Sequence, residues 1–234
     1  MIQGKSVLAI IPARGGSKGI PRKNIREVGG KPLLSWTIDE AKKSDFIDRL
    51  IVSTDDEEIA DVARHNGVEV PFLRPENLAM DDTPGIAPVL HALEVLPGYD
   101  YVVLLQPTSP LRQVEDIDGC IEKCVIEQAK ACVSVTLAEK TPYWMYHLSE
   151  HGLLKSVINI EKQFFRRQDI PPVFSLNGAV YMADSNWLQK TQSFLEQETV
   201  GYVMPKERSI DIDNEMDIVF FEALISQMKN RLER

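Results

Sequence analysis

The sequence is poor in cysteine, has no long apolar run and carries no excess of positive charge. No fourth metal ligand is evident near the cysteines, so we expect reduced, largely buried thiols and not a zinc site; the three residues are Cys120, Cys124 and Cys132. No apolar run approaches the roughly 18 residues of a membrane span, and the first residues lack the apolar core of a signal peptide, which favours a cytoplasmic protein. The net charge of −9 over 234 residues argues against nucleic acid or an anionic membrane as the partner.

The positive charge that is present lies near the start of the chain. Residues 1–31 hold seven Lys or Arg against one acid, so this segment carries +6 and the remainder carries −15. Most of it surrounds a Gly-rich turn, residues 13–24, which follows an apolar run typical of a buried strand, residues 7–11. Glycines let backbone amides approach an anion, and basic side chains balance its charge. The turn matches neither the Walker A pattern nor G-x-G-x-x-G, but it predicts a polyphosphate site, with a basic surface loop as the alternative.

The rest of the chain alternates strand and helix patterns, which predicts an α/β fold with a mainly parallel sheet and helices on both faces. Helices are expected over residues 31–41, 56–65, 84–96, 114–128 and 215–231, the last capped by Asp213 or Asn214. Further strands are expected over residues 50–55, 68–72, 102–105, 131–136, 174–182 and 200–204.

This alternation stops between about residues 139 and 172. The segment contains a probable hairpin turn at Gly152, no amphipathic helix of normal length, and an aromatic cluster formed by Tyr143, Trp144, Tyr146, Phe164 and Phe165. Such a segment either covers a site or meets a partner chain. We therefore expect a single domain over residues 1–234, with residues 139–172 as an insertion in it.

Two aspartates near the last helix are candidate metal ligands. On a strand, Asp211 and Asp213 would share one face and Ile210 and Ile212 the other. Two carboxylates together with substrate phosphates are a ligand set that suits Mg²⁺. The alternative is that Asp213 only caps the helix that follows, and both roles could coexist.

Other polar residues follow strands and could contact a ligand. The stiff loop 106–112, with two prolines, begins at the carboxyl end of a buried strand, although its polar groups could make only local turn bonds. Arg166 and Arg167 precede a strand that carries Asn177, and an arginine fork suits a carboxylate, although a solvated basic pair is the alternative. Arg74 follows a short strand, where a plain surface arginine is the alternative to a ligand contact.

Taken together, these stretches resemble the cytidylyltransferases that activate sialic acids and related nonulosonic acids as CMP-sugars. The blocks that carry the resemblance recur in family order over nearly the whole chain, at residues 11–24, 52–55, 73–75, 105–112, 177–181 and 209–213. The resemblance implies a three-layer Rossmann-like nucleotidyltransferase fold and an enzyme that uses CTP and a nonulosonic acid. It also implies Mg²⁺ as cofactor, with Mn²⁺ as a substitute, and a homodimer in which the insertion reaches the neighbouring subunit.

The resemblance also implies roles for individual residues. Nucleotide binding is expected from Arg14, Gly15, Gly16, Ser17, Lys18, Lys23, Asn24 and Arg74, with Arg74 near the cytosine. Contacts to the sugar acid are expected from Gln106, Arg167 and Asn177, and metal binding from Asp211 and Asp213. The residues expected to be catalytic are Arg14, Lys18, Lys23 and Asp211.

Two alternatives stay open at this point. One is a nucleotidyltransferase of the same fold for another sugar acid such as Kdo, against which the Lys23-Asn24 pair and the Gln106 loop argue. The other is a nucleotide-binding module without turnover, against which the paired aspartates argue. Close sialic acid synthetases often have Arg-Pro before the Asn-Gly pair, where this chain has Ser175-Leu176, so the identity of the sugar remains open among sialic, legionaminic and pseudaminic acids.

Overall fold

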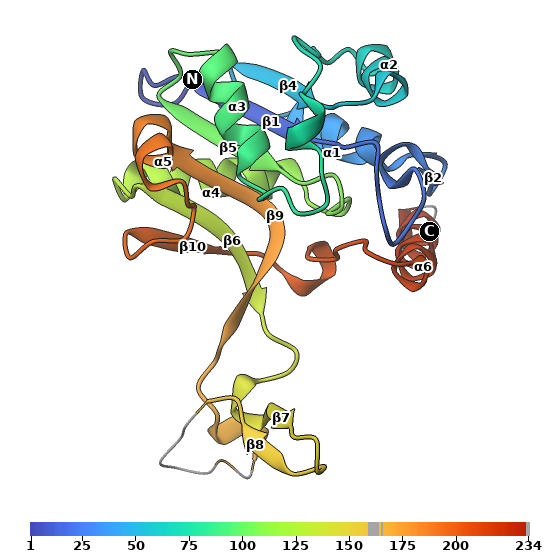
Figure 1. Ribbon diagram of the computed structural model, residues 1–234, viewed down its shortest axis with the longest axis vertical. Coiled ribbons are helices and arrows are strands. Elements are labelled where there is room, and N and C mark those ends of the chain that lie inside the picture. Colours follow the sequence, from blue (N-terminus) through green and yellow to red (C-terminus); the bar gives the residue numbers. More distant parts are fainter. Residues whose placement is uncertain (159–163, 165, 233–234) are drawn as a thin grey trace.

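The computed structural model describes residues 1–158, 164 and 166–232, and within them the central feature is a six-stranded mixed sheet (Figure 1). The strands are β1 (Val7–Pro12), β4 (Arg49–Ser53), β5 (Tyr101–Leu105), β6 (Ala131–Leu137), β9 (Phe174–Asp184) and β10 (Thr199–Val203), in the order β10-β6-β9-β5-β1-β4. β1 pairs in parallel with β4 and β5, and β10 pairs in parallel with β6. β9 runs antiparallel to both β5 and β6. The mainly parallel sheet expected from the sequence is therefore confirmed, with one reversed strand inside it.

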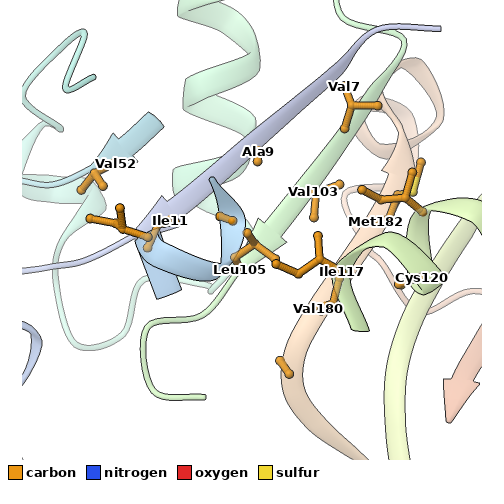
Figure 2. Packing of buried hydrophobic residues seen from close by; sticks show 14 of the residues in the cluster. Val7, Ala9, Ile11, Val52, Val103, Leu105, Ile117, Cys120, Val180 and Met182 are labelled. Carbon is orange, nitrogen blue, oxygen red and sulfur yellow. The ribbon is translucent and has the colours of Figure 1, made fainter. Parts of the chain in front are cut away.

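Helices cover both faces of this sheet and bury the apolar side chains that β1 carries on both sides. Val7, Ala9 and Ile11 point to one face, where they pack with α1 (Leu33–Ala41), α2 (Glu57–His65) and α4 (Val114–Ile126), as Figure 2 shows in part. Leu8 and Ile10 point to the other face and pack with α3 (Ala87–Val95) and α5 (Ser185–Thr191). The alternation of one fully buried strand thus produces the expected three-layer α/β arrangement.

Side-chain caps fix where two of the helices begin. Asp56 caps α2 by accepting a hydrogen bond from the backbone amide of Ile59. At the C-terminal helix α6 (Glu215–Leu232), Asn214 Oδ1 accepts from the amide of Met216, so the cap is Asn214. The alternative role of Asp213 as this cap is wrong, and its side chain is left for other contacts.

The sequence prediction fails at one edge of the sheet. The strand expected over residues 68–72 is replaced by two isolated bridges, Ile51 to Glu69 and Thr54 to Leu73. Pro71 lies between the bridges and has no amide hydrogen, so it cannot donate to a regular ladder. The remaining short elements of the body are β2 (Glu27–Val28), β3 (Lys31–Pro32), η1 (Lys23–Ile25), η2 (Glu76–Leu78) and η5 (Lys206–Arg208).

Between β6 and β9 the chain leaves the body and forms an arm, residues 138–173, which stands well apart from the sheet in Figure 1. The arm contains η3 (Pro142–Trp144), the hairpin β7 (Tyr146–Leu148) and β8 (Leu154–Ser156), and η4 (Arg167–Asp169). Gly152, with φ of 76°, lies in the hairpin turn as expected. The arm exposes large apolar side chains, which are Trp144, Met145, Tyr146, Leu148, Leu153, Leu154 and Val157. Across the residues described, no helix combines the length and apolar character needed to cross a membrane.

Candidate active site

The Gly-rich loop after β1 is fixed by contacts to two later segments. The amide of Gly15 donates to Asp55 Oδ1 at 3.1 Å, and Asn24 Nδ2 donates to the carbonyl oxygen of Arg14 at 2.9 Å. A Cβ atom on Gly15 would lie 2.7 Å from Asp56 Oδ2, and one on Gly19 would lie 2.3 Å from the carbonyl oxygen of Asp213. Gly19 therefore has no room for a side chain, because the backbone of Asp213 packs against it, whereas a side chain at Gly15 would displace the carboxylate of Asp56.

A first cavity of about 310 Å³ opens beside this loop. One wall comes from the loop, through Arg14, Gly16, Ser17, Lys23 and Asn24. Residues of the segment 78–85 also line the cavity, as do Arg74 and Gln106. Gly15 and Lys18 do not line it, but Lys18 pairs with Asp81 of that segment. The structure thus gathers most of the residues predicted to bind the nucleotide around one space. We call this space the basic cavity.

Arg74 is buried beside the basic cavity and contacts Asp55. Its side chain is 3% exposed and its Nη2 lies 3.4 Å from Asp55 Oδ1, while its amide donates to the carbonyl oxygen of Thr54 at 2.7 Å. Burial lowers the pKa of the Arg74 guanidinium, and the negative charge of Asp55 opposes that shift. The alternative of a plain surface arginine is therefore wrong. Because Asp55 Oδ1 also accepts from Gly15, one carboxylate connects Arg74 with the Gly-rich loop.

A second cavity of about 330 Å³ adjoins the first one. β9 is antiparallel, so its first half, with Asn177, lies at the edge of the sheet where β5 ends and Gln106 follows. The lining includes Gln106, Ser175, Asn177, Tyr181, Ser209 and Asp211. Gln106 lines both cavities, and a Cβ on Gly178 would lie only 3.3 Å from its Oε1. We call the second space the acidic cavity, because Asp211 is the charged residue among those that line it.

Asn177 is buried and its amide is engaged by protein groups. Its Oδ1 accepts from Ser134 Oγ at 2.6 Å and from the amide of Ala179 at 3.2 Å. Its Nδ2 donates to Ser209 Oγ at 2.9 Å. The predicted sugar-binding residue therefore also links β6 and β9 to the segment that leads to Asp211.

The two aspartates lie in an extended segment that is not a strand. Ile212 is fully buried and its amide donates to the carbonyl oxygen of Thr108 at 2.8 Å, while Asp211 and Asp213 reach the surface. The strand assumed for this segment is wrong, but the predicted alternation of exposed carboxylates and buried isoleucine is present. Lys23 Nζ lies 3.1 Å from Asp213 Oδ1 and donates to the carbonyl oxygen of Ile212 at 2.8 Å.

The donor chemistry of this pair fits a hard divalent cation. Although Asp211 reaches the surface, partial burial of its carboxyl group raises the pKa of that group. The Thr108 side chain opposes that shift and the charge of Asp213 adds to it. A bound cation would relieve the repulsion between the carboxylates of Asp211 and Asp213. In the described part of the chain no three metal-binding side chains cluster together, so further ligands would have to come from substrate phosphates or water, as Mg²⁺ commonly accepts.

Arg167 is the residue predicted to bind the carboxylate of the sugar acid. Its backbone belongs to η4, near the end of the arm, and its side chain lies outside what the structure describes. The neighbouring Arg166 is exposed and pairs with Asp169 at 2.8 Å, which agrees with the surface alternative for that residue. Phe165, which we counted in the aromatic cluster, also lies outside the described residues.

Arg112 was given no role in the sequence analysis, but its side chain connects two segments of the site. Its side chain is fully buried, and its Nη1 donates to the carbonyl oxygens of Gln106 at 3.1 Å and Ala179 at 2.8 Å. Burial lowers the pKa of this guanidinium to about 10. Arg112 therefore ties the Gln106 loop to β9. The available signal was a charged residue in a stiff, proline-rich loop, since such a group is buried only when the fold uses it.

The α/β sheet, the basic Gly-rich loop at its carboxyl edge and the adjoining pair of carboxylates together define a protein of the nucleotidyltransferase class. The sequence matches the family described as Cytidylyltransferase over residues 8–229, and the chain belongs to that family.

Three relatives and two solved structures illustrate the similarity. The chain is 36% identical over 228 residues to the N-acylneuraminate cytidylyltransferase of Escherichia coli O18:K1:H7, covering 96% of this chain but 53% of that protein, so it spans about half of that relative's length. It is 36% identical to the CMP-N,N'-diacetyllegionaminic acid synthase of Legionella pneumophila, covering 94% of this chain and 96% of the relative. It is also 36% identical to a pseudaminic acid cytidylyltransferase of Campylobacter jejuni, covering 93% and 95%.

The solved structures support the fold. CMP:2-keto-3-deoxy-manno-octonic acid synthetase in complex with CTP superposes with a TM-score of 0.74 at 13% identity, covering 95% of this chain and 99% of that one. The 4-diphosphocytidyl-2C-methyl-D-erythritol synthase of Anaerococcus prevotii superposes with a TM-score of 0.66 at 18% identity, covering 96% and 100%. At these identities the similarity establishes the shared fold alone.

Proposed function

We propose that this protein transfers CMP from CTP to the anomeric hydroxyl of a nonulosonic acid, with release of pyrophosphate. The names of relatives that cover most of the chain support this class of substrate. The observation that carries the proposal is the position of Gln106, which lines both the basic and the acidic cavity. A nucleotide in the basic cavity and a sugar acid in the acidic cavity would therefore meet beside one side chain.

The residues of the basic cavity would hold CTP. Arg14, Lys18 and Lys23 would bind the phosphates, with the backbone of Gly15 and Gly16 and the polar groups of Ser17 and Asn24 beside them. Arg74, fixed by Asp55, would lie near the cytosine. Their contribution is to position the α-phosphate and to stabilise the charge that builds up on it and on the leaving pyrophosphate.

The residues of the acidic cavity would hold the acceptor. Gln106 and Asn177 would contact the sugar acid, and Arg167 would pair with its carboxylate. Asp211 and Asp213 would hold Mg²⁺, or Mn²⁺ in its place. When bound, such an ion supplies charge stabilisation for the pyrophosphate group that leaves. Lys23 contacts Asp213 and lines the basic cavity, so it would sit between metal and phosphates.

We further propose that the protein acts as a homodimer through the arm. The arm projects from the body and exposes a run of large apolar side chains that a monomer leaves in water (Figure 1). Contiguous apolar surface of this kind marks an interface, and two-fold dimers are the commonest assembly. Arg167 lies at the arm's return to β9, so the partner could help border the sugar pocket.

A pyrophosphate-release assay tests the proposed reaction. The purified protein is incubated with Mg²⁺ and each of the four NTPs, with N-acetylneuraminate, a legionaminic acid, a pseudaminic acid or Kdo as acceptor. We expect release with CTP and at least one of the three nonulosonic acids, and little with Kdo or with the other NTPs. Release with Kdo alone, or no release with any pair, would contradict the proposal. Asp211→Asn serves as the control for release by a contaminating enzyme.

A further inference from the structure

Asp81 lies against the two cations at the start of the Gly-rich loop. Its Oδ1 is 2.9 Å from Arg14 Nη2, and its Oδ2 is 3.1 Å from Lys18 Nζ. Each carboxylate oxygen therefore faces a different cation. Arg14 Nη1 also donates to the carbonyl oxygen of Met80 at 2.9 Å, so the same segment holds the guanidinium by its backbone.

Asp81 is well suited to stay charged in this position. Lys18 is the main cause that lowers the pKa of its carboxyl group, and Arg14 adds to the effect. The carboxylate is therefore ionised at neutral pH. Both Arg14 and Asp81 line the basic cavity, so their contact lies at the space that a nucleotide would enter.

The contact satisfies Arg14 and Lys18 in the way that a ligand phosphate would. A phosphate group binds cations through two or more oxygens, and Asp81 presents two oxygens to two cations. A triphosphate that takes the positions of the Asp81 oxygens on Arg14 Nη2 and Lys18 Nζ displaces the carboxylate from them. Its binding must exchange one anion for another, and the lost ion pairs reduce the net gain.

We propose that Asp81 is an internal competitor for the phosphate site, which lowers the affinity for CTP and pyrophosphate and returns to Arg14 and Lys18 when pyrophosphate leaves. The inference rests on the proposed function, because it takes phosphates as the ligands of these two cations. Its consequence is kinetic as well as thermodynamic. A carboxylate that re-forms its ion pairs helps to expel a strongly charged product from a cluster of basic residues.

Asp82 offers a matched control in the same segment. It is the next residue, carries the same charge and is exposed, and no ion pair involves it in the part of the chain that the structure describes. Asp82→Asn therefore changes the net charge near the site as Asp81→Asn does, but leaves the contact to Arg14 and Lys18 in place. Asp81→Glu keeps the charge and is the conservative variant.

The test is calorimetric titration of wild type, Asp81→Asn, Asp82→Asn and Asp81→Glu with inorganic pyrophosphate and with CTP. We expect Asp81→Asn to bind both ligands about threefold to tenfold more tightly, since two exposed ion pairs no longer compete. Pyrophosphate should then inhibit turnover by Asp81→Asn at correspondingly lower concentration. Asp82→Asn should change affinity clearly less, and Asp81→Glu should resemble wild type.

The outcomes separate this inference from the proposed function. Equal or weaker binding by Asp81→Asn, or an equal gain in Asp82→Asn, would overturn the competitor role while CTP binding by wild type leaves the proposed function standing. Tighter pyrophosphate binding by Asp81→Asn in a protein that makes no CMP-sugar would support the competitor and contradict the reaction. A wild type that binds neither pyrophosphate nor CTP would overturn both.

Discussion

Lys23 Nζ lies 3.1 Å from Asp213 Oδ1, although the two residues are 190 positions apart in the chain. The lysine belongs to the Gly-rich loop after the first strand, and the aspartate to the segment before the last helix. Their contact brings a lysine of the basic loop beside the candidate metal ligands. A nucleotide held by the loop would therefore present its phosphates to the two carboxylates.

This relationship predicts that Asp211 and Asp213 are needed for turnover and not for folding. Asp211→Asn or Asp213→Asn, each nearly equal in size to the residue replaced, should lower kcat at least about a hundredfold, equivalent to about 2.7 kcal/mol of transition-state stabilisation. Circular dichroism should show an unchanged fold. Near-normal kcat with Mg²⁺ in both variants would remove the pair from the mechanism.

Substitutions in the basic cavity should weaken the binding of CTP and not that of the sugar acid. Arg14→Ala and Lys23→Ala should each weaken CTP binding at least about tenfold, because each removes a charge-assisted contact to phosphate. Binding of the sugar acid should change little, since neither side chain lines the acidic cavity. Calorimetry with each substrate alone measures both effects. Unchanged CTP affinity together with weakened sugar binding would show that the two cavities were assigned in the wrong order.

Gly19 provides a test of the packing between the loop and the acidic segment. A Cβ at this position would lie 2.3 Å from the carbonyl oxygen of Asp213, so Gly19→Ala must push the two segments apart. We expect a loss of about 1–3 kcal/mol in the free energy of unfolding, together with a large loss of kcat. Gly16→Ala is the stability control, because its Cβ would meet no atom within 4 Å. Equal denaturation midpoints for the two variants would contradict the packing argument.

The layered fold could be predicted from the sequence because the patterns that indicate strands and helices are local. The run from Val7 to Ile11 is apolar on both faces of a strand, and that pattern predicts helices above and below it. The direction of β9 could not be predicted in this way, because strand polarity depends on the path of the long insertion before it. A strand was predicted over residues 68–72 because Pro71 does not change the apolar pattern there. Pro71 interrupts the hydrogen-bond ladder, and the structure has isolated bridges at Glu69 and Leu73 instead.

The candidate site was predictable as a set of residues but not as a geometry. The basic loop and the two aspartates were both identified, and the structure brings them together through Lys23 and Asp213. The role of Asp81 was not accessible from the sequence, because it depends on contacts to Arg14 and Lys18, which are distant in the chain. The link from Arg112 to Ala179 was not accessible for the same reason. An aspartate in a polar loop looks like a solvated charge until Arg14 is found beside it.

Asp56 should show a defined dependence of stability on pH. Its side chain caps α2 and pairs with Arg22, and the hydrogen bond to Arg22 is the main cause that lowers the pKa of its carboxyl group. Asp56→Asn, which keeps an oxygen for the cap, should lose a few tenths to about 1 kcal/mol of unfolding free energy at pH 7. Because folding lowers the pKa of Asp56, its ionised carboxylate stabilises the fold at pH values above the unfolded-state pKa of about 3.9. This contribution is lost as the pH falls through the pKa of Asp56 in the folded protein. Urea unfolding at pH 7 and near pH 3 should therefore show a difference that shrinks at acid pH, and a difference that grows there would contradict the ion pair.

The arm predicts the assembly state. Trp144 is 44% exposed near the base of the β7–β8 hairpin, among other exposed apolar side chains, so an acid there would place a charge in the proposed interface. Trp144→Asp should shift the mass measured by light scattering at micromolar concentration from a dimer towards the 26.4 kDa monomer and lower activity with it. Leu195→Asp is the matched control, because Leu195 is 50% exposed on the body between α5 and β10 and should leave the mass unchanged. The sheet should remain folded in both variants, since the arm stands outside its core (Figure 1). A fully active wild-type protein that scatters as a monomer would show that the apolar surface of the arm has another role.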